Sequence, residues 1–189
     1  MILSSRFTDA LTYAASLHAN QRRKITHEPY LAHLLAVTAL VLEYGGGEDE
    51  AIAALLHDAV EDQGGAATRE EIRRRFGPAV VEIVEGCTDT DQTPKPPWRE
   101  RKEAHVARLR EASPSVQLVV AADKIHNARS IDRGYRLLGD ELWGHFRGGR
   151  DGMIWYFRAV ADALSHAERS PIVDELEAAV TSLERLGGS

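Results

Sequence analysis

Apolar residues recur at helical spacing along nearly the whole chain, and this period constrains the fold more than any other feature. Phe7, Ala10, Leu11, Ala14 and Leu17 are three or four residues apart, which places them on one face of a helix. Similar stretches follow along the chain, and glycine or proline interrupts them. We find no convincing alternation of polar and apolar residues that would indicate a strand. The sequence therefore predicts an all-α fold.

The interruptions divide the chain into separate helices. Thr68 and Glu71 form a T-x-x-E pattern that predicts a capping box at the start of one of them. We expect a single helical bundle of about eight to ten helices that spans residues 1–189, with a core over about residues 5–167 and a C-terminal helix over 170–187. The expected helices cover about residues 5–19, 31–44, 49–62, 69–76, 78–86, 97–111, 115–131 and 152–167, before the last one. The stretch 88–98 has three prolines and predicts a loop that is long enough to be functional.

Composition narrows the class of protein. The net charge of −6 argues against a nucleic-acid partner, because neutralising phosphates requires a basic face. The only cysteine, Cys87, excludes an internal disulfide. No apolar run approaches the length of a membrane span. We expect a cytoplasmic protein without a membrane partner, and the sequence does not indicate its oligomeric state.

The stretch AALLHDAVED, residues 53–62, places one histidine and three carboxylates at the end of an apolar run. On a continuous helix His57, Asp58 and Glu61 would lie within about 100° of one another, and Asp62 would lie near 140°. The adjoining face of this helix is apolar. Clustered carboxylates repel one another and are costly to bury unless a cation compensates them. The pattern therefore favours a bound metal ion.

Two further residues have the types that such a site needs. His33 lies inside a strongly apolar helix, where a lone histidine is more often a hydrogen-bonded core residue than a ligand. Asp123 ends another apolar run, and it could instead form a buried ion pair with Lys124 or Arg129. Together with His57 and Asp58, these residues give two imidazoles and two carboxylates, which suit a divalent transition metal.

These residues and their surroundings resemble a known family. The set His33, His57-Asp58 and Asp123 resembles the metal site of the HD-domain phosphohydrolases, which are all-helical. The segments HANQRRKITHEPYLAH (18–33), AALLHDAVED (53–62), FGPAVVEIVEGCTD (76–89) and ADKIHNARS (122–130) are similar to the hydrolase domain of the Rel/Spo alarmone enzymes. The similarity is greatest to the free-standing small alarmone hydrolases, and it covers about residues 7–156.

The resemblance implies removal of the 3′-pyrophosphate from ppGpp or pppGpp, with Mn²⁺ held by His33, His57, Asp58 and Asp123. Glu61, one turn beyond His57, is placed for acid–base catalysis. Asp62 is expected to orient the water or to make an outer contact with the site. The alternative is that both acids merely end a helix. The expected partner is a small-molecule nucleotide.

The resemblance also assigns residues that contact the nucleotide. Arg23 and Lys24 match the family's nucleotide-contacting pair, and Asn127 matches a further contact. The remaining candidates are Lys124, Arg129 and Tyr156, which are also compatible with solvent-facing, structural and core roles respectively. Lys95 and Arg101, near the long loop, are candidates for phosphate contacts.

Two other functions remain open at this stage. One keeps the metal site but acts as a phosphatase on NADPH or another nucleotide. The other is an HD-fold antitoxin that neutralises a synthetase-like toxin. The sequence departs from the family at Glu28, where glycine is common, at Leu34, where proline is common, and within residues 144–157. The last departure could reshape the pocket.

Overall fold

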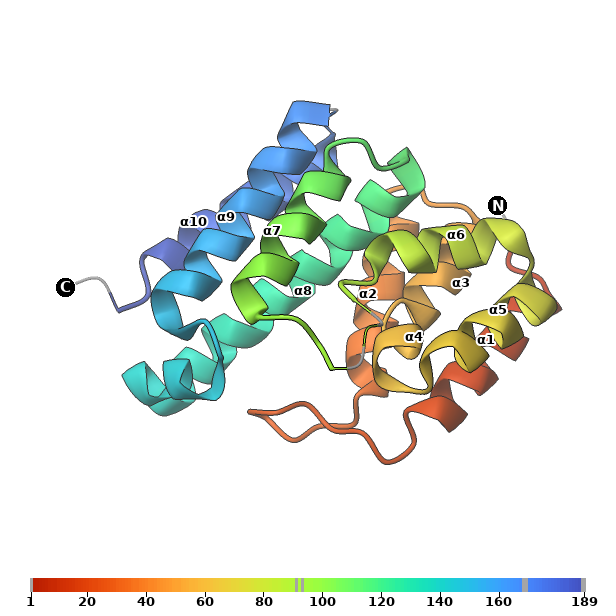
Figure 1. Ribbon diagram of the computed structural model, residues 1–189, viewed down its shortest axis with the longest axis horizontal. Coiled ribbons are helices and arrows are strands. Elements are labelled where there is room, and N and C mark those ends of the chain that lie inside the picture. Colours follow the sequence, from red (N-terminus) through yellow and green to blue (C-terminus); the bar gives the residue numbers. More distant parts are fainter. Residues whose placement is uncertain (1, 91, 93, 168–169, 188–189) are drawn as a thin grey trace.

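Helices form nearly all the regular structure of the chain (Figure 1). The computed structural model describes residues 2–90, 92, 94–167 and 170–187. Within this part, the extended backbone pairs only in an isolated antiparallel bridge between Arg22 and Pro29. The prediction of an all-α fold is confirmed. The helices are α1 Ser5–Leu17, α2 Leu31–Glu43, α3 Glu48–Leu56, α4 Ala59–Asp62, α5 Gly65–Phe76, α6 Pro78–Cys87, α7 Trp98–Leu109, α8 Pro114–Leu138, the 3-10 helix η1 Gly139–His145, α9 Gly149–Ala167 and α10 Pro171–Glu184.

The helix starts follow from local capping chemistry. The Ser4 hydroxyl accepts a hydrogen bond from the Arg6 backbone N–H and caps α1. Glu50 accepts a hydrogen bond from the Gly47 N–H at the start of α3. The first turn of α3 is acidic, and its negative charges interact favourably with the positive end of the helix dipole. Pro114 begins α8 at a position where its missing N–H is not needed. The starts of α3 and α8 help to set the positions of His57, which follows α3, and of Asp123 in α8.

Helix α8 is the central element of the bundle. It packs against α2, α3, α6, α9 and α10. In Figure 1, α1 to α6 lie to the right of α8, whereas α7, α9 and α10 lie to its upper left. The core includes fully buried side chains such as Leu34, Leu55, Ile125 and Leu164. Each such side chain contributes about 1.5–3 kcal/mol to the free energy of unfolding.

Two local predictions were wrong. The predicted helix over 49–62 is interrupted at His57 and Asp58, which separate α3 from α4. The predicted capping box does not form, because α5 already begins at Gly65 and the Thr68 hydroxyl donates to the Gln63 carbonyl. Glu71 instead accepts hydrogen bonds from Arg74 and Arg75 one turn further along α5.

The C-terminal half also differs from the prediction. Helix α8 continues to Leu138, seven residues past the predicted end at Ile131, and η1 was not predicted. Gly134 lies inside α8, where an added Cβ would lie 2.9 Å from Leu142 of η1. The glycine therefore permits η1 to pack closely against α8. None of the helices in the described part of the chain has the length and apolar character that crossing a membrane requires.

Candidate metal centre and its pocket

The centre of the site is the short turn between α3 and α4. Leu56 ends α3 in the core, and His57 follows it with only 3% of its surface exposed. The His57 Nδ1 donates a hydrogen bond to the Ala54 carbonyl at 2.8 Å. The next side chain, Asp58, accepts a hydrogen bond from the Tyr30 hydroxyl at 2.5 Å. The turn thus fixes the imidazole and the carboxylate side by side.

Two more candidate ligands reach this turn from other helices. His33 of α2 places its Nε2 3.6 Å from Asp58 Oδ2, and His57 Nε2 lies 3.0 Å from the same oxygen. Asp123 of α8 places its Oδ1 3.2 Å from His33 Nε2 and 3.6 Å from His57 Nε2. His33, His57 and Asp58 each offer an atom within 4.8 Å of the others, a spacing that one ion can bridge. The structure therefore brings together all four residues that the sequence suggested.

The donor atoms of this cluster fit a divalent metal. The Nε2 atoms of His33 and His57 are buried, and neither has a hydrogen-bond partner among the described residues. A buried nitrogen left unpartnered is costly unless it binds something else. The Nδ1 of His57 already donates to a carbonyl, so a neutral ring offers its Nε2 lone pair to the centre. Two imidazoles and two carboxylates are a suitable set for a transition metal.

The electrostatics of the cluster also require a positive partner. Burial lowers the pKa of His57, but Asp58 and Asp123 outweigh burial and leave this pKa well above its ordinary value. Burial raises the pKa of Asp58, whereas His57 and His33 hold it well below its usual range. The carboxylates are therefore ionised and stabilise a nearby cation, which is either a proton on an imidazole or a metal.

The two acids after the turn face the same centre. Glu61 and Asp62 lie on α4, and both line the central cavity. Glu61 forms an ion pair of 2.8 Å with Lys95 from the loop before α7. Asp62 accepts a hydrogen bond of 2.8 Å from the Gln21 side chain. Partial removal from water and the neighbouring Asp58 raise the pKa of Asp62.

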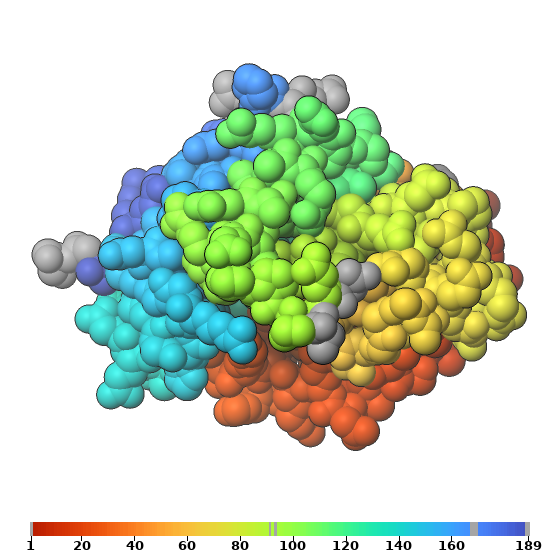
Figure 2. All heavy atoms as spheres, viewed as in Figure 1, coloured from red at the N-terminus to blue at the C-terminus, as the bar shows by residue number. Residues whose placement is uncertain are grey.

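The cluster opens into a cavity of about 620 Å³. Figure 2 shows that α7 and the loop before it cover the middle of this face, between α4 and α5 in yellow and α9 in blue. Among the described residues that line the cavity are eight lysines and arginines but five carboxylates. The wall is therefore cationic although the whole chain carries a charge of −6. Such a cavity attracts an anionic ligand of small-molecule size.

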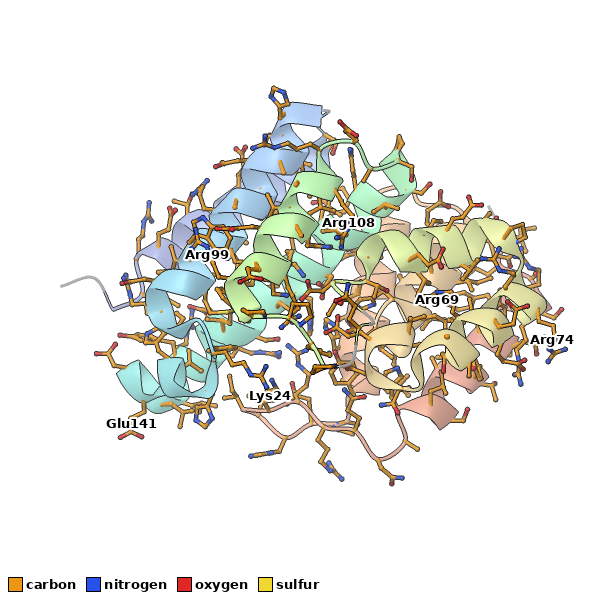
Figure 3. The ribbon with its side chains drawn as sticks, viewed as in Figure 1. Lys24, Arg69, Arg74, Arg99, Arg108 and Glu141 are labelled. Carbon is orange, nitrogen blue, oxygen red and sulfur yellow. The ribbon has the colours of Figure 1, made fainter. Side chains whose placement is uncertain are left out.

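One wall links the candidate metal ligand Asp123 to a cation of the N-terminal loop. Asn127, one turn after Asp123, donates to Asp123 Oδ1 at 2.6 Å. Its own carbonyl oxygen accepts from Arg23 at 2.7 Å. Lys24 also lines the cavity, and Figure 3 shows it on the loop below the lower end of α7. Arg23, Lys24 and Asn127 thus lie on the side of the cavity next to the metal cluster.

Tyr156 of α9 also lines the cavity. Its ring is buried at 4% exposure. Lys102 Nζ lies 4.5 Å from the ring centroid and Lys124 Nζ lies 5.5 Å from it. Lys124 also pairs with Asp123 at 2.5 Å, so the alternative role considered for Asp123 coexists with its place in the metal cluster. Lys124 therefore lies between the metal cluster and Tyr156, and Lys102 contacts the same ring.

Residues 10–154 match the family described as HD domain. The chain belongs to the HD-domain family. The match covers well over half of the chain and includes every residue of the metal cluster. The family resemblance inferred from the sequence is confirmed.

Two curated proteins and one solved structure are also similar to this chain. The guanosine-3′,5′-bis(diphosphate) 3′-pyrophosphohydrolase MESH1 of Xenopus tropicalis is 41% identical over 128 residues, which are 66% of this chain and 69% of that protein. Human MESH1 is 36% identical over 133 residues, covering 69% and 72% of the two chains. A solved structure, described as a metazoan ortholog of SpoT that hydrolyzes ppGpp, superimposes with a TM-score of 0.80 at 26% identity and covers 98% of this chain and 99% of that one.

One predicted contact of the HD-domain pocket lies elsewhere. Arg129 does not line the cavity in the described part of the chain, and it forms an ion pair with Glu175 of α10. Glu175 also accepts a hydrogen bond from the Tyr44 hydroxyl, so Arg129 belongs to a polar cluster that joins α2, α8 and α10. The spacing along α8 explains this difference, because Arg129 is two residues beyond Asn127 and faces another side of the helix.

Lys95 of the loop before α7 and Arg101 of α7, which the sequence suggested as phosphate contacts, line the cavity and contact carboxylates of the protein. Lys95 pairs with Glu61, and Arg101 pairs with Asp89 inside the cavity wall. Asp89 also accepts from Lys102 at 2.9 Å. These cations therefore hold the wall of the HD-domain pocket together, and both lysines remain close to the cavity.

Sequence reasoning did not single out several residues that support the HD-domain centre. Tyr30 holds Asp58, Gln21 holds Asp62, and His126 contacts His33. All three lie within three residues of predicted site residues, in segments already quoted for the family resemblance. Their proximity in the sequence was the available signal, but only the structure shows which ligand each one contacts.

Proposed function

We propose that this chain is a metal-dependent hydrolase that removes the 3′-pyrophosphate of ppGpp or pppGpp, with Mn²⁺ at His33, His57, Asp58 and Asp123. The observation that carries the proposal is the pair of unpartnered, buried Nε2 atoms facing two carboxylates at the end of a cationic cavity. The names of the MESH1 relatives support the substrate. The cytoplasmic location stays a prediction from the sequence.

The reaction consumes one water and gives GDP or GTP with pyrophosphate. Water attacks the phosphorus bonded to the 3′ oxygen, that bond breaks, and the 3′ oxygen gains a proton. A metal, when bound, polarises a phosphoryl oxygen and lowers the pKa of a water at the site. The residues of the chain supply the remaining steps.

Glu61 is the proposed acid–base group. It lies four residues past His57, lines the cavity and is not buried in the core. Its partner Lys95 lies on the loop before α7, and the ion pair holds the carboxylate near the cluster. Glu61 takes the proton from the water and returns one to the 3′ oxygen. Asp62, held by Gln21, orients the water.

The cationic walls bind the nucleotide. Arg23, Lys24 and Asn127 hold the nucleoside beside the metal cluster, because a planar guanidinium stacks on a purine and an amide offers both donor and acceptor. Lys124 and Tyr156 also line the cavity. Holding both ends of the nucleotide places the 3′ substituent over the centre, which converts the attack of water into an oriented reaction.

The decisive experiment is a hydrolysis assay with Mn²⁺ across ppGpp, pppGpp, GTP, GDP and NADPH. We expect pyrophosphate release from ppGpp and pppGpp, with GTP and GDP unchanged. Glu61→Gln should keep its metal content but lose about 100-fold or more in kcat. Arg23→Ala should mainly raise KM, because its contact exists in both ground and transition states. Arg129→Ala is the matched control outside the cavity and should leave both constants unchanged.

Other outcomes would contradict parts of the proposal. Release of orthophosphate from NADPH with ppGpp inert would replace the alarmone substrate but keep the metal chemistry. Full activity of Glu61→Gln at unchanged metal content would remove Glu61 from the mechanism. A metal-loaded protein that cleaves nothing would favour the role as a toxin partner.

A further inference from the structure

His126 contacts a candidate metal ligand from the side opposite the metal. It lies on α8, three residues after Asp123 and next to Asn127. Its Nδ1 lies 2.7 Å from the Nδ1 of His33, and the two ring centroids are 4.8 Å apart with a tilt of 43°. One turn of α8 therefore carries a ligand of the centre, the amide that holds this ligand, and a ring that touches the ligand from α2.

The direction of this hydrogen bond follows from the role of His33. A hydrogen bond between two nitrogens requires one donor and one acceptor. His33 Nε2 faces Asp58 and Asp123 and can bind a metal only when it carries no proton. A neutral His33 then carries its proton on Nδ1, and this N–H donates to His126 Nδ1. His126 keeps its own proton on Nε2.

We propose that His126 is a positioning residue for the metal centre: its Nδ1 accepts the hydrogen bond of His33 Nδ1, fixes the His33 ring and directs the bare Nε2 at the metal. The proposal rests on the metal site of the proposed function but is independent of the substrate. Outer partners of this kind set the tautomer and orientation of ligating histidines, and their loss typically lowers metal affinity about 10- to 100-fold.

The two candidate histidine ligands differ in what accepts the proton on Nδ1, and this difference makes His126 the residue to test. His57 has its Nδ1 proton accepted by the backbone carbonyl of Ala54, which no substitution removes. His33 depends on a side chain from another helix, so a single substitution can remove its support. His126 thereby also joins α8 to α2 at the centre, in addition to the ligand Asp123.

The test compares His126→Leu with His126→Asn. The two new side chains have nearly the same shape, but only the asparagine oxygen offers an acceptor close to the position of Nδ1. Binding of Mn²⁺ alone, without nucleotide, is measured by electron paramagnetic resonance of the free ion. We expect His126→Leu to bind Mn²⁺ about 10- to 100-fold more weakly than the wild type. His126→Asn should bind Mn²⁺ with an affinity close to that of the wild type.

Three results would overturn the proposal. Wild-type affinity in His126→Leu would show that the contact is not needed. Equal weakening in both variants would show a structural role in which the acceptor does not matter. No Mn²⁺ binding by the wild type would remove the metal site itself. If the protein binds Mn²⁺ normally but cleaves none of the nucleotides tested, the result contradicts only the proposed substrate.

A measurement on the wild type covers the case in which the leucine variant does not fold. ¹⁵N-histidine NMR of the protein loaded with diamagnetic Zn²⁺ reports the tautomer of each ring. The proposal requires the proton of His33 on Nδ1 and that of His126 on Nε2. The opposite tautomer of His126 would overturn it.

Discussion

Buried polar residues in the cavity wall show how single side chains set the properties of this protein. His105 of α7 has only 1% of its surface exposed. Its ring lies 6.4 Å from that of Tyr156, and its Nδ1 lies 3.5 Å from Arg108. Burial and the charges of Lys124 and Lys102 lower the pKa of His105 to about 3. The residue is therefore neutral in the folded protein at neutral pH.

This shift predicts a loss of stability in mild acid. The unfolded chain binds a proton at His105 below a pKa of about 6.5, whereas the folded chain does not until about pH 3. The free energy of unfolding therefore falls as the pH falls through this window, by about 2 kcal/mol at pH 5 for this residue. His105→Asn should lose correspondingly less stability between pH 7 and pH 5, as measured by urea unfolding at both pH values.

The exposed His166 at the end of α9 provides the control for this measurement. His166→Asn makes the same substitution at an exposed histidine, and its stability is measured at both pH values beside that of His105→Asn. An equally steep loss in His105→Asn would show that protonation of His105 does not drive the acid sensitivity.

At the scale of the elements, glycines decide how closely helices approach. Gly86 lies near the end of α6, where an added Cβ would lie 2.5 Å from Val116 Cγ2 of α8. Val116 is buried at 6% exposure, so the two helices pack with no room for a methyl group at this point. Alanine is otherwise preferred to glycine within helices by about 1 kcal/mol. The contact and the helix propensity therefore act in opposite directions.

We predict that the side chain at position 116 decides whether Gly86→Ala lowers or raises the free energy of unfolding. In the wild type the substitution should lower the free energy of unfolding by about 1–3 kcal/mol, because it overpacks the contact. In the background of Val116→Ala it should instead be neutral or stabilising, because the clashing methyl groups are gone. A double-mutant cycle by urea unfolding tests this, and additive effects of the two substitutions would show that the contact is not the cause.

At the scale of the whole molecule, the candidate metal centre joins segments that are far apart in the sequence. His33 comes from α2, His57 and Asp58 from the turn after α3, and Asp123 from α8. A metal that binds these four residues binds the folded chain but not the unfolded one. Its binding free energy therefore adds to the stability of the bundle.

Mn²⁺ should accordingly raise the thermal unfolding midpoint. At a metal concentration of 100 times Kd, the expected gain is about 2.7 kcal/mol, which corresponds to roughly 5–11 °C for a chain of this size. Differential scanning calorimetry with and without EDTA measures the shift. His57→Ala should show no shift, and Asp58→Ala should behave in the same way. A full shift in both variants would place the metal elsewhere in the protein.

The sequence by itself determined the helical class of this protein, most helix positions and the chemical types at the centre. The helical period, the glycine and proline breaks and the apolar surroundings of His33, His57 and Asp123 are local patterns, so they can be read without a fold. The expected starts of α2, α6 and α10 agree with the structure to within about one residue for the same reason.

Only the tertiary structure decided which residues meet. It interrupts the helix at His57 and Asp58, where Tyr30 holds the aspartate from another segment. It turns Arg129 toward Glu175 of α10, and it brings His126 against His33 of α2. These outcomes depend on how helices distant in the sequence pack, and on which glycines permit close approach, as Gly134 does for η1. Periodicity fixes the face of one helix, but the partner of that face is set by packing across the whole bundle.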